Sequence, residues 1–482
     1  MRYAAGLLIL LTVVAAIVIL RLREVQDFAV PRNTIVVVAA LDGPDPQRYR
    51  VTDNVVTRLT HSLAGFEGVE IRRLDGVIGG QEGRLNARRL GQRHRAALVL
   101  WGVYSATESE VVLTVELEQL APAKTLPLPP VKDHIARAVL AEPGHFTVQQ
   151  GLFEERGVTE SLVDGLVRYE GTEYPEAVQD LSAVLDLARP LGLMREMLLS
   201  RGNAFLVWGK PQQAIEDYSK ALQISPAYSA AYTSLGLAYM VLGKNQQAIL
   251  KYNQAIQINP REAAAYIDRG VAYAVLGDDR KAIEEYNQAL QIAPTDATAY
   301  LDRGVSYAAL GDHRRAIRDF SDSARINSRE ATAYVDRGLS YAALENYPRA
   351  IADYSRALQI DSRSATAYYH RGVAYTFLRR HREAIADFSR VVEINPRYAD
   401  AYRDRGTNYL ISGKSQQALQ DSSRAIEINP KDAQAYYMRG LSYVVRGEAE
   451  KAIEDLQKVL GISSDPVLRR QTEEQLSRLR RE

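Results

Sequence analysis

The sequence predicts a mainly α-helical solenoid of helix hairpins, preceded by a small α/β domain and an N-terminal transmembrane helix. Three observations carry this prediction: glycine recurs every 34 residues over the C-terminal two thirds, strand-like and helix-like segments alternate before that region, and the chain opens on an apolar run. A fixed period of this size indicates a unit that cannot bury its own apolar face, so that neighbouring units must stack into a solenoid.

Small residues define the repeat. An alanine follows each of eight glycines twelve residues later, and small residues at both positions let two helix backbones approach closely. The glycines are Gly202, Gly236, Gly270, Gly304, Gly338, Gly372, Gly406 and Gly440.

Aromatic residues keep the same period in three rows. Two of them, exemplified by Tyr300 and Tyr307, lie seven residues apart and share a helix face. The third row lies on the second helix and lapses after its sixth member; it comprises Tyr218, Tyr252, Tyr286, Phe320, Tyr354 and Phe388. We interpret the aromatic residues as inter-helix core rather than ligand contacts.

These glycine, aromatic and alanine positions, with proline at the end of several units, resemble the tetratricopeptide repeat (TPR) family. The resemblance covers residues 195–466 in eight copies. It implies a right-handed superhelix with a concave groove that holds a peptide or protein segment. A degenerate repeat is predicted at 158–194, and a C-terminal capping helix at 467–482.

Charged residues also follow the period. An arginine precedes seven of the eight glycines, and an acid stands sixteen residues after each of these arginines. The one unit without the arginine, which has Leu235, is also the one without the acid, because it has Lys251. We predict an Arg–carboxylate bridge that joins the two helices of each repeat. The alternative is a set of independent solvated charges.

The resemblance places the groove on the first helix of each repeat. The predicted partner-binding residues are largely apolar, so we expect an apolar or extended segment, or a partner's helix, rather than an acidic tail. The alternative is a wall closed by its own packing. The candidates are Ile267, Val271, Leu301, Val305, Val335, Leu339, Tyr369 and Val373, together with Asn203 and Arg403, which break the apolar pattern.

The apolar run Ala4–Leu20 predicts an uncleaved transmembrane anchor at residues 1–23. The run reaches about 26 Å as a helix, close to the thickness of a bilayer core. It is longer than the apolar core of a cleaved signal peptide. Flanking charges are balanced and so do not set the orientation, and the absence of cysteine is compatible with an oxidising compartment as with any other. We therefore expect a single-pass membrane protein whose remaining part is extracytoplasmic, at a bacterial envelope.

Residues 32–120 are predicted to form a small α/β domain of order β-α-β-α-β-β. Strands are expected at 34–40, 69–71, 97–102 and 110–117, with helices at 51–66 and 84–95. The stretch around Leu90 and the run Ala97–Gly102 resemble the N-terminal domain of TolB-type envelope proteins, which implies an interaction module. Prolines then predict a spacer, followed by a connecting helix from Val131 to Leu140, within residues 121–157.

The sequence offers no constellation for catalysis, and no cofactor or metal is predicted. The histidines are scattered without zinc-ligand spacing, Gly79–Gly83 lacks a phosphate-loop lysine, and the net charge is only +1, so nucleic acid is not an expected partner. The leading prediction is a membrane-anchored, non-enzymatic scaffold that binds protein or peptide segments, with self-association left open. The alternative is an α/β domain that senses a ligand or nucleotide and is coupled to the repeats.

Overall fold

The computed structural model describes residues 34–44, 50–66, 68–78, 83–106, 111–120, 125–127, 137–141, 145–151, 158–187 and 191–480. Contacts divide the chain into two compact units. The first unit comprises Met1–Leu128 and Ala138–Asp268, and the second comprises Pro129–Arg137 and Arg269–Glu482.

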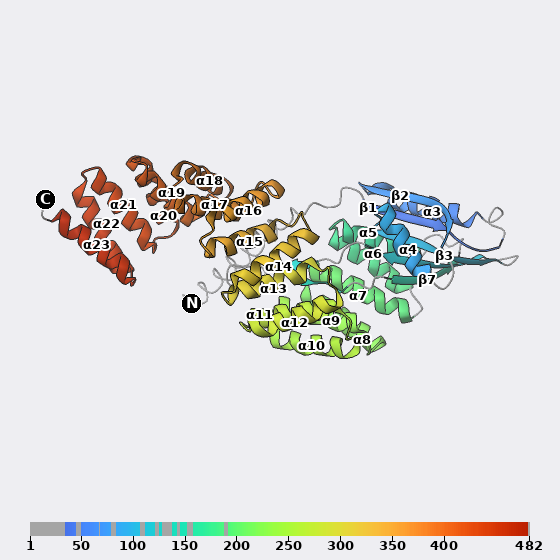
Figure 1. Cartoon of the computed structure of the whole chain (residues 1–482). Helices are drawn as coiled ribbons and strands as arrows, with labels where there is room; N and C mark the ends of the chain where they lie inside the picture. The colour runs from blue at the N-terminus through green and yellow to red at the C-terminus, as the bar shows by residue number, and fades with distance from the viewer. Residues whose placement is uncertain are drawn as a thin grey trace, which may run out of the picture. The chain divides into compact units, whose positions relative to one another are not determined.

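A five-stranded mixed sheet forms part of the first unit (Figure 1). Its order is β2-β1-β3-β4-β7, with β1 parallel to β2 and β3, and β4 antiparallel to β3 and β7. The predicted β-α-β-α-β-β order is confirmed, with α3 (Val51–Ser62) and α4 (Gly83–His94) between strands. The strands are β1 (Thr34–Ala40), β2 (Val69–Val77), β3 (Leu98–Ala106), β4 (Val111–Gln119) and β7 (His145–Gly151), and a separate pair is formed by β5 (Thr125–Pro127) and β6 (Arg137–Val139).

Both faces of the sheet are buried along β1, which explains the continuous apolar sequence of this strand. Val36 and Val38 pack into one core with α3, and Ile35 and Val37 pack into another with Ala87 of α4. The first core also includes residues of α5 (Val158–Glu170), α6 (Tyr174–Leu187) and α7 (Leu191–Val207). The hairpin at the predicted degenerate repeat and the sheet therefore share one hydrophobic core.

The region predicted as a spacer and connecting helix contains strands instead. Arg137–Val139 form β6 rather than the end of a helix, and β7 adds a strand to the sheet by pairing Phe146 with Leu117. Phe146 is fully buried. The rest of the predicted connecting helix lies outside the described residues. The sequence prediction was wrong here because a short apolar stretch fits a strand as well as a helix.

Helices joined by short turns form the described residues from 158 onward, and in the second unit α13 to α22 stack as successive hairpins (Figure 1). The closing helix α23 begins at Pro466, and its cap residue Asp465 accepts a hydrogen bond from the amide of Val467 at 2.9 Å. The helices are α8 (Pro211–Ile224), α9 (Ser229–Val241), α10 (Asn245–Ile258), α11 (Ala263–Val275), α12 (Asp279–Ile292), α13 (Ala297–Ala309), α14 (His313–Ile326), α15 (Ala331–Ala343), α16 (Tyr347–Ile360), α17 (Ala365–Phe377), α18 (His381–Ile394), α19 (Ala399–Ile411), α20 (Ser415–Ile428), α21 (Ala433–Val445), α22 (Ala449–Ile462) and α23 (Pro466–Leu479).

Each glycine of the 34-residue row lies against the second helix of its own repeat. A Cβ atom built on Gly304 would come within 2.6 Å of the Phe320 ring, and one on Gly338 within 2.6 Å of the Tyr354 ring. Both rings are at most 1% exposed. The third aromatic row therefore forms inter-helix core, as predicted.

The predicted membrane localisation is contradicted by the helices that the structure describes. None of them combines the length and the apolar composition needed to cross a bilayer. The segment that carried the prediction, residues 1–23, lies outside the described residues. The single-pass anchor and the extracytoplasmic placement are therefore not carried into the function proposed below.

Candidate functional site

Successive first helices of the second unit lie next to one another. α13 contacts α15, α15 contacts α17, α17 contacts α19, and α19 contacts α21. We call their partly exposed side chains, Val305, Leu339, Tyr369, Val373 and Arg403, the first-helix face. The contiguity of the helices brings these predicted groove residues onto one surface.

The other predicted groove residues are buried. Ile267 and Val271 are each 1% exposed, and Leu301 and Val335 are below a tenth. Leu301 packs in a cluster with Phe320 of its own repeat, and Val335 packs in the same way with Tyr354. These side chains therefore stabilise the hairpins, and any role for them in partner binding stays a prediction.

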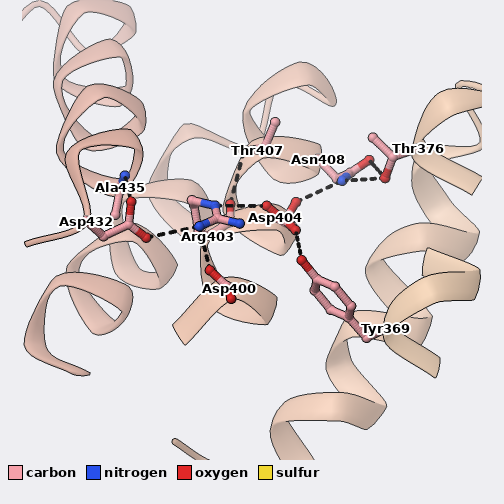
Figure 2. Close-up of polar contacts among 9 residues, drawn as sticks. All are labelled: Tyr369, Thr376, Asp400, Arg403, Asp404, Thr407, Asn408, Asp432 and Ala435. Carbon is pink, nitrogen blue, oxygen red and sulfur yellow. Dashed lines mark hydrogen bonds and ion pairs between the residues drawn. The ribbon is translucent and has the colours of Figure 1, made fainter. Parts of the chain in front are cut away.

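A polar cluster around Arg403 interrupts the apolar row. The guanidinium donates from Nη1 to Asp400 at 2.5 Å and to Asp432 at 3.2 Å, and from Nε to Asp404 at 3.0 Å. The Tyr369 hydroxyl donates to the other oxygen of Asp404 at 2.8 Å. Figure 2 shows Arg403 between Asp432 and Asp404, with Tyr369 pointing at Asp404 from the preceding first helix.

Asn408 extends this cluster toward α17 and α18. Its side-chain amide donates to the Thr376 hydroxyl at 2.9 Å and to the main-chain oxygen of Asp404 at 2.8 Å (Figure 2). Its carbonyl oxygen lies 2.8 Å from Nδ1 of His381. Asn408 is fully buried. The sequence analysis did not find this amide, because a single asparagine in one repeat of eight gives no periodic signal.

The cluster around Arg403 carries excess negative charge, since three carboxylates share one guanidinium. Burial raises the pKa of Asp404, and Asp400 adds to the rise while Arg403 opposes it. Burial alone would disfavour the charged guanidinium, but Asp404, Asp400 and Asp432 together raise the pKa of Arg403. Burial and the neighbouring Asp404 also raise the pKa of Tyr369. Arg403 is therefore neutralised by its own chain, and the surface around it favours a cation.

Asp404→Asn should change how stability depends on pH. The folded-state pKa of Asp404 is raised, so the native chain binds this proton more tightly than the unfolded chain does. Wild-type stability should fall relative to Asp404→Asn as pH rises from below the ordinary aspartate pKa through the raised value, and the difference should then level off. Urea denaturation of both proteins at a series of pH values measures this. If the free energy of unfolding of the wild type instead rose relative to that of Asp404→Asn over this pH range, the raised pKa of Asp404 would be contradicted.

The predicted Arg–carboxylate bridges are confirmed in all seven repeats that carry both residues. The closest nitrogen–oxygen distances are 2.6–2.7 Å, from Arg201–Asp217 to Arg439–Asp455. In Arg303–Asp319 the contact is bidentate, with Nε–Oδ2 at 2.7 Å and Nη2–Oδ1 at 2.8 Å. Hydrogen bonding to Asp319 raises the pKa of Arg303. Planar bidentate pairing fixes the relative orientation of the two helices.

The arginines also bind the preceding repeat, which the sequence analysis missed. Arg337 donates from Nη1 to Ser321 at 3.0 Å, and Arg371 and Arg405 do the same to Ser355 and Ser389. These serines also recur every 34 residues, so the signal was present in the sequence. Each such arginine therefore joins three helices, two in its own repeat and one in the repeat before.

Asn203, the other exception to the apolar pattern, lies in the first unit and is fully buried. Its amide donates to the main-chain oxygen of Ala141 at 3.0 Å, and its carbonyl accepts from the Tyr218 hydroxyl at 2.8 Å. A predicted groove residue thus holds a segment of the same chain. Among the described residues there is no group of three or more acidic or histidine side chains placed to hold a metal ion.

Stacked hairpins with a 34-residue period and a contiguous row of first helices define a helical-hairpin repeat protein. The chain is a tetratricopeptide repeat protein: a model described as TPR repeat matches residues 202–243 and 338–376, and three models described as tetratricopeptide repeat match residues 233–297, 365–398 and 423–454. The recognition made from the sequence is confirmed. The resemblance of residues 32–120 to the TolB-type domain stays a prediction.

Solved structures of repeat proteins are similar to parts of the chain. The crystal structure of YrrB, described as a TPR protein with an unusual peptide-binding site, is 24% identical, covers 38% of this chain and 95% of YrrB, and has a TM-score of 0.35. Crystalline MamA is 26% identical, with coverage of 34% and 96% and a TM-score of 0.31. A tetratricopeptide repeat protein from Parabacteroides merdae is 23% identical, with coverage of 52% and 98% and a TM-score of 0.39. No curated protein matched the sequence.

Proposed function

We propose that the chain is a non-catalytic scaffold that binds a segment of a protein partner on the first-helix face of its second unit. The observation that carries the proposal is the row Val305, Leu339 and Val373, which stays partly exposed while the neighbouring Leu301 and Val335 are buried. A partner that covers these partly exposed apolar side chains would gain a binding free energy of about 25 cal/mol for each Å² of apolar surface that becomes buried.

The negative charge at the end of this row restricts the kind of segment that can bind. The face runs from apolar side chains on α13, α15 and α17 to the negative cluster around Arg403 on α19. A segment with apolar residues followed by lysine or arginine complements both parts. An acidic tail would meet carboxylates that already occupy Arg403, so it is disfavoured.

Replacing Val305, Leu339 and Val373 together by aspartate should reduce binding of such a segment at least tenfold. The measurement is titration of the full chain with a labelled peptide library in which apolar residues precede a basic end. The reason is that each aspartate places a charge where the partner would bury an apolar group.

The matched control replaces Leu310, Leu344 and Leu378 by aspartate. Each of these lies five residues after a test position and is more than a third exposed, so the same charge enters the same three repeats. Retained binding in the control with loss in the test variant supports the proposal. Equal loss in both, or loss of helicity in the test variant alone, contradicts it.

The sensing alternative for the α/β domain stays a prediction. Helices pack against both faces of the sheet around β1 and β3, which is the arrangement expected of a structural or interaction module. Self-association of the repeats also remains a prediction.

A further inference from the structure

The chain places one of its own extended segments against the first regular repeat. Leu140 and Ala141 directly follow β6 without helical structure, and they are 1% and 8% exposed. The segment and helices α7 to α10 belong to the same compact unit. Burial of a non-helical segment requires that its main-chain polar groups find partners.

The first helices α7 and α9 supply a partner for the Ala141 carbonyl. The Asn203 amide on α7 donates to it at 3.0 Å, and the Ser234 hydroxyl on α9 lies within 3.5 Å of the same oxygen. All three groups are buried. Without a donor, this carbonyl would lose its hydrogen bonds to water on burial and gain none in return, which would destabilise the buried segment.

Tyr218 orients this amide. Its hydroxyl donates to the Asn203 carbonyl oxygen at 2.8 Å, which leaves the NH2 group directed at Ala141. Tyr218 is fully buried and belongs to the second helix of the same repeat. The orientation of the Asn203 amide that binds the segment is therefore set by Tyr218, within the same α7–α8 hairpin.

Asn203 is the single amide at its position in the array. The residue after each of the other row glycines is apolar or threonine, and these residues are Leu237, Val271, Val305, Leu339, Val373, Thr407 and Leu441. A side-chain amide that donates to a main-chain carbonyl recognises the backbone of a segment rather than a particular side chain. It can therefore bind any extended segment in which the residue next to that carbonyl can be buried.

We propose that α7, α8 and α9 form a second peptide site, which the chain fills with Leu140 and Ala141, the residues directly after β6, as an internal ligand. An external extended segment with an apolar residue followed by a small one would bind there by displacing it. This inference extends the proposed function, because it assumes that the repeats bind extended segments. It concerns different helices from the first-helix face, so the two can fail separately.

The test uses the full chain and a labelled synthetic peptide with the sequence of residues 138–145. Leu140→Asp should release the internal segment, because aspartate cannot remain buried there without a partner. Trypsin cleavage of the Arg137–Ala138 bond, followed by mass spectrometry, should then be at least tenfold faster than in the wild type. The peptide should bind this variant at least tenfold more tightly than it binds the wild type.

Asn203→Asp added to Leu140→Asp should abolish peptide binding, because the carboxylate repels the carbonyl while still accepting from Tyr218. Adding the aspartates at Val305, Leu339 and Val373 instead should leave peptide binding unchanged, which separates this site from the first-helix face. If Leu140→Asp does not fold, excess peptide should still accelerate cleavage of the same bond in the wild type. Faster cleavage without peptide binding, or no acceleration by the peptide, would show that the segment is a structural strap and overturn the proposal.

Discussion

Replacing Asp319 by alanine should destabilise the pair of helices α13 and α14 by about 3 kcal/mol, near the low end for breaking a buried ion pair. Asp319 is almost fully buried and holds Arg303 through two hydrogen bonds. The loss of Asp319 leaves Arg303, whose side chain is only 18% exposed, without a carboxylate partner and next to a cavity. Native-state hydrogen exchange measures the free energy of local opening, which suits a repeat array that need not unfold as one unit.

The chain provides its own control for this prediction. The repeat with Leu235 and Lys251 lacks the bridge at the same two positions and still forms α9 and α10. Arg303→Leu combined with Asp319→Lys should therefore be less destabilising than Asp319→Ala alone, because no guanidinium is left buried without its carboxylate and the lysine ammonium reaches solvent, as it does in the partly exposed Lys251. A double variant that is worse than the single one would show that the arginine stabilises the hairpin chiefly by packing.

Gly338→Ala should destabilise its hairpin by about 1–3 kcal/mol relative to Gly406→Ala, as expected for overpacking. The new Cβ at Gly338 would come within 2.6 Å of the buried Tyr354 ring. At Gly406 the nearest atoms, including the Ser422 hydroxyl, are 3.3 Å away. Both glycines lie inside first helices, so the gain in helix propensity, about 1 kcal/mol, is common to the two variants.

Hydrogen exchange of α15 and α19 in the two variants gives the comparison directly. In a Tyr354→Ser background, measured against Tyr354→Ser alone, Gly338→Ala should cost no more than Gly406→Ala does in the wild type, since the glycine then faces a serine as Gly406 faces Ser422. Equal behaviour of the two single variants would mean that the Tyr354 ring moves aside freely, and the close approach of the helices would then not require glycine.

The periodic features of the fold could be predicted from the sequence because each was repeated. The row that includes Gly304, the aromatic row that includes Phe320 and the bridge between Arg303 and Asp319 all recur at fixed spacing, and the structure places them as expected. The same reasoning located the strands of the α/β domain, where alternation and apolar runs were clear.

Features that occur once could not be predicted in the same way. Nothing local in the sequence shows that β7 joins β4, or that Asn203 binds Ala141, because both contacts depend on how distant segments fold together. Exposure was also beyond the sequence: Leu301 and Val305 are both apolar and four residues apart, yet one is buried and the other partly exposed. The groove predicted from the sequence therefore contained both buried residues and residues of the first-helix face.

The arginine that ties a repeat to its predecessor has a consequence for how such a chain can grow. Arg337 reaches Asp353 sixteen residues ahead and Ser321 sixteen residues behind, so all its partners lie within one repeat length. When a gene duplication inserts a whole repeat, or a deletion removes one, the arginine at the new junction finds the same serine and carboxylate partners. The number of repeats can therefore change during evolution without further substitutions at the contacts between repeats.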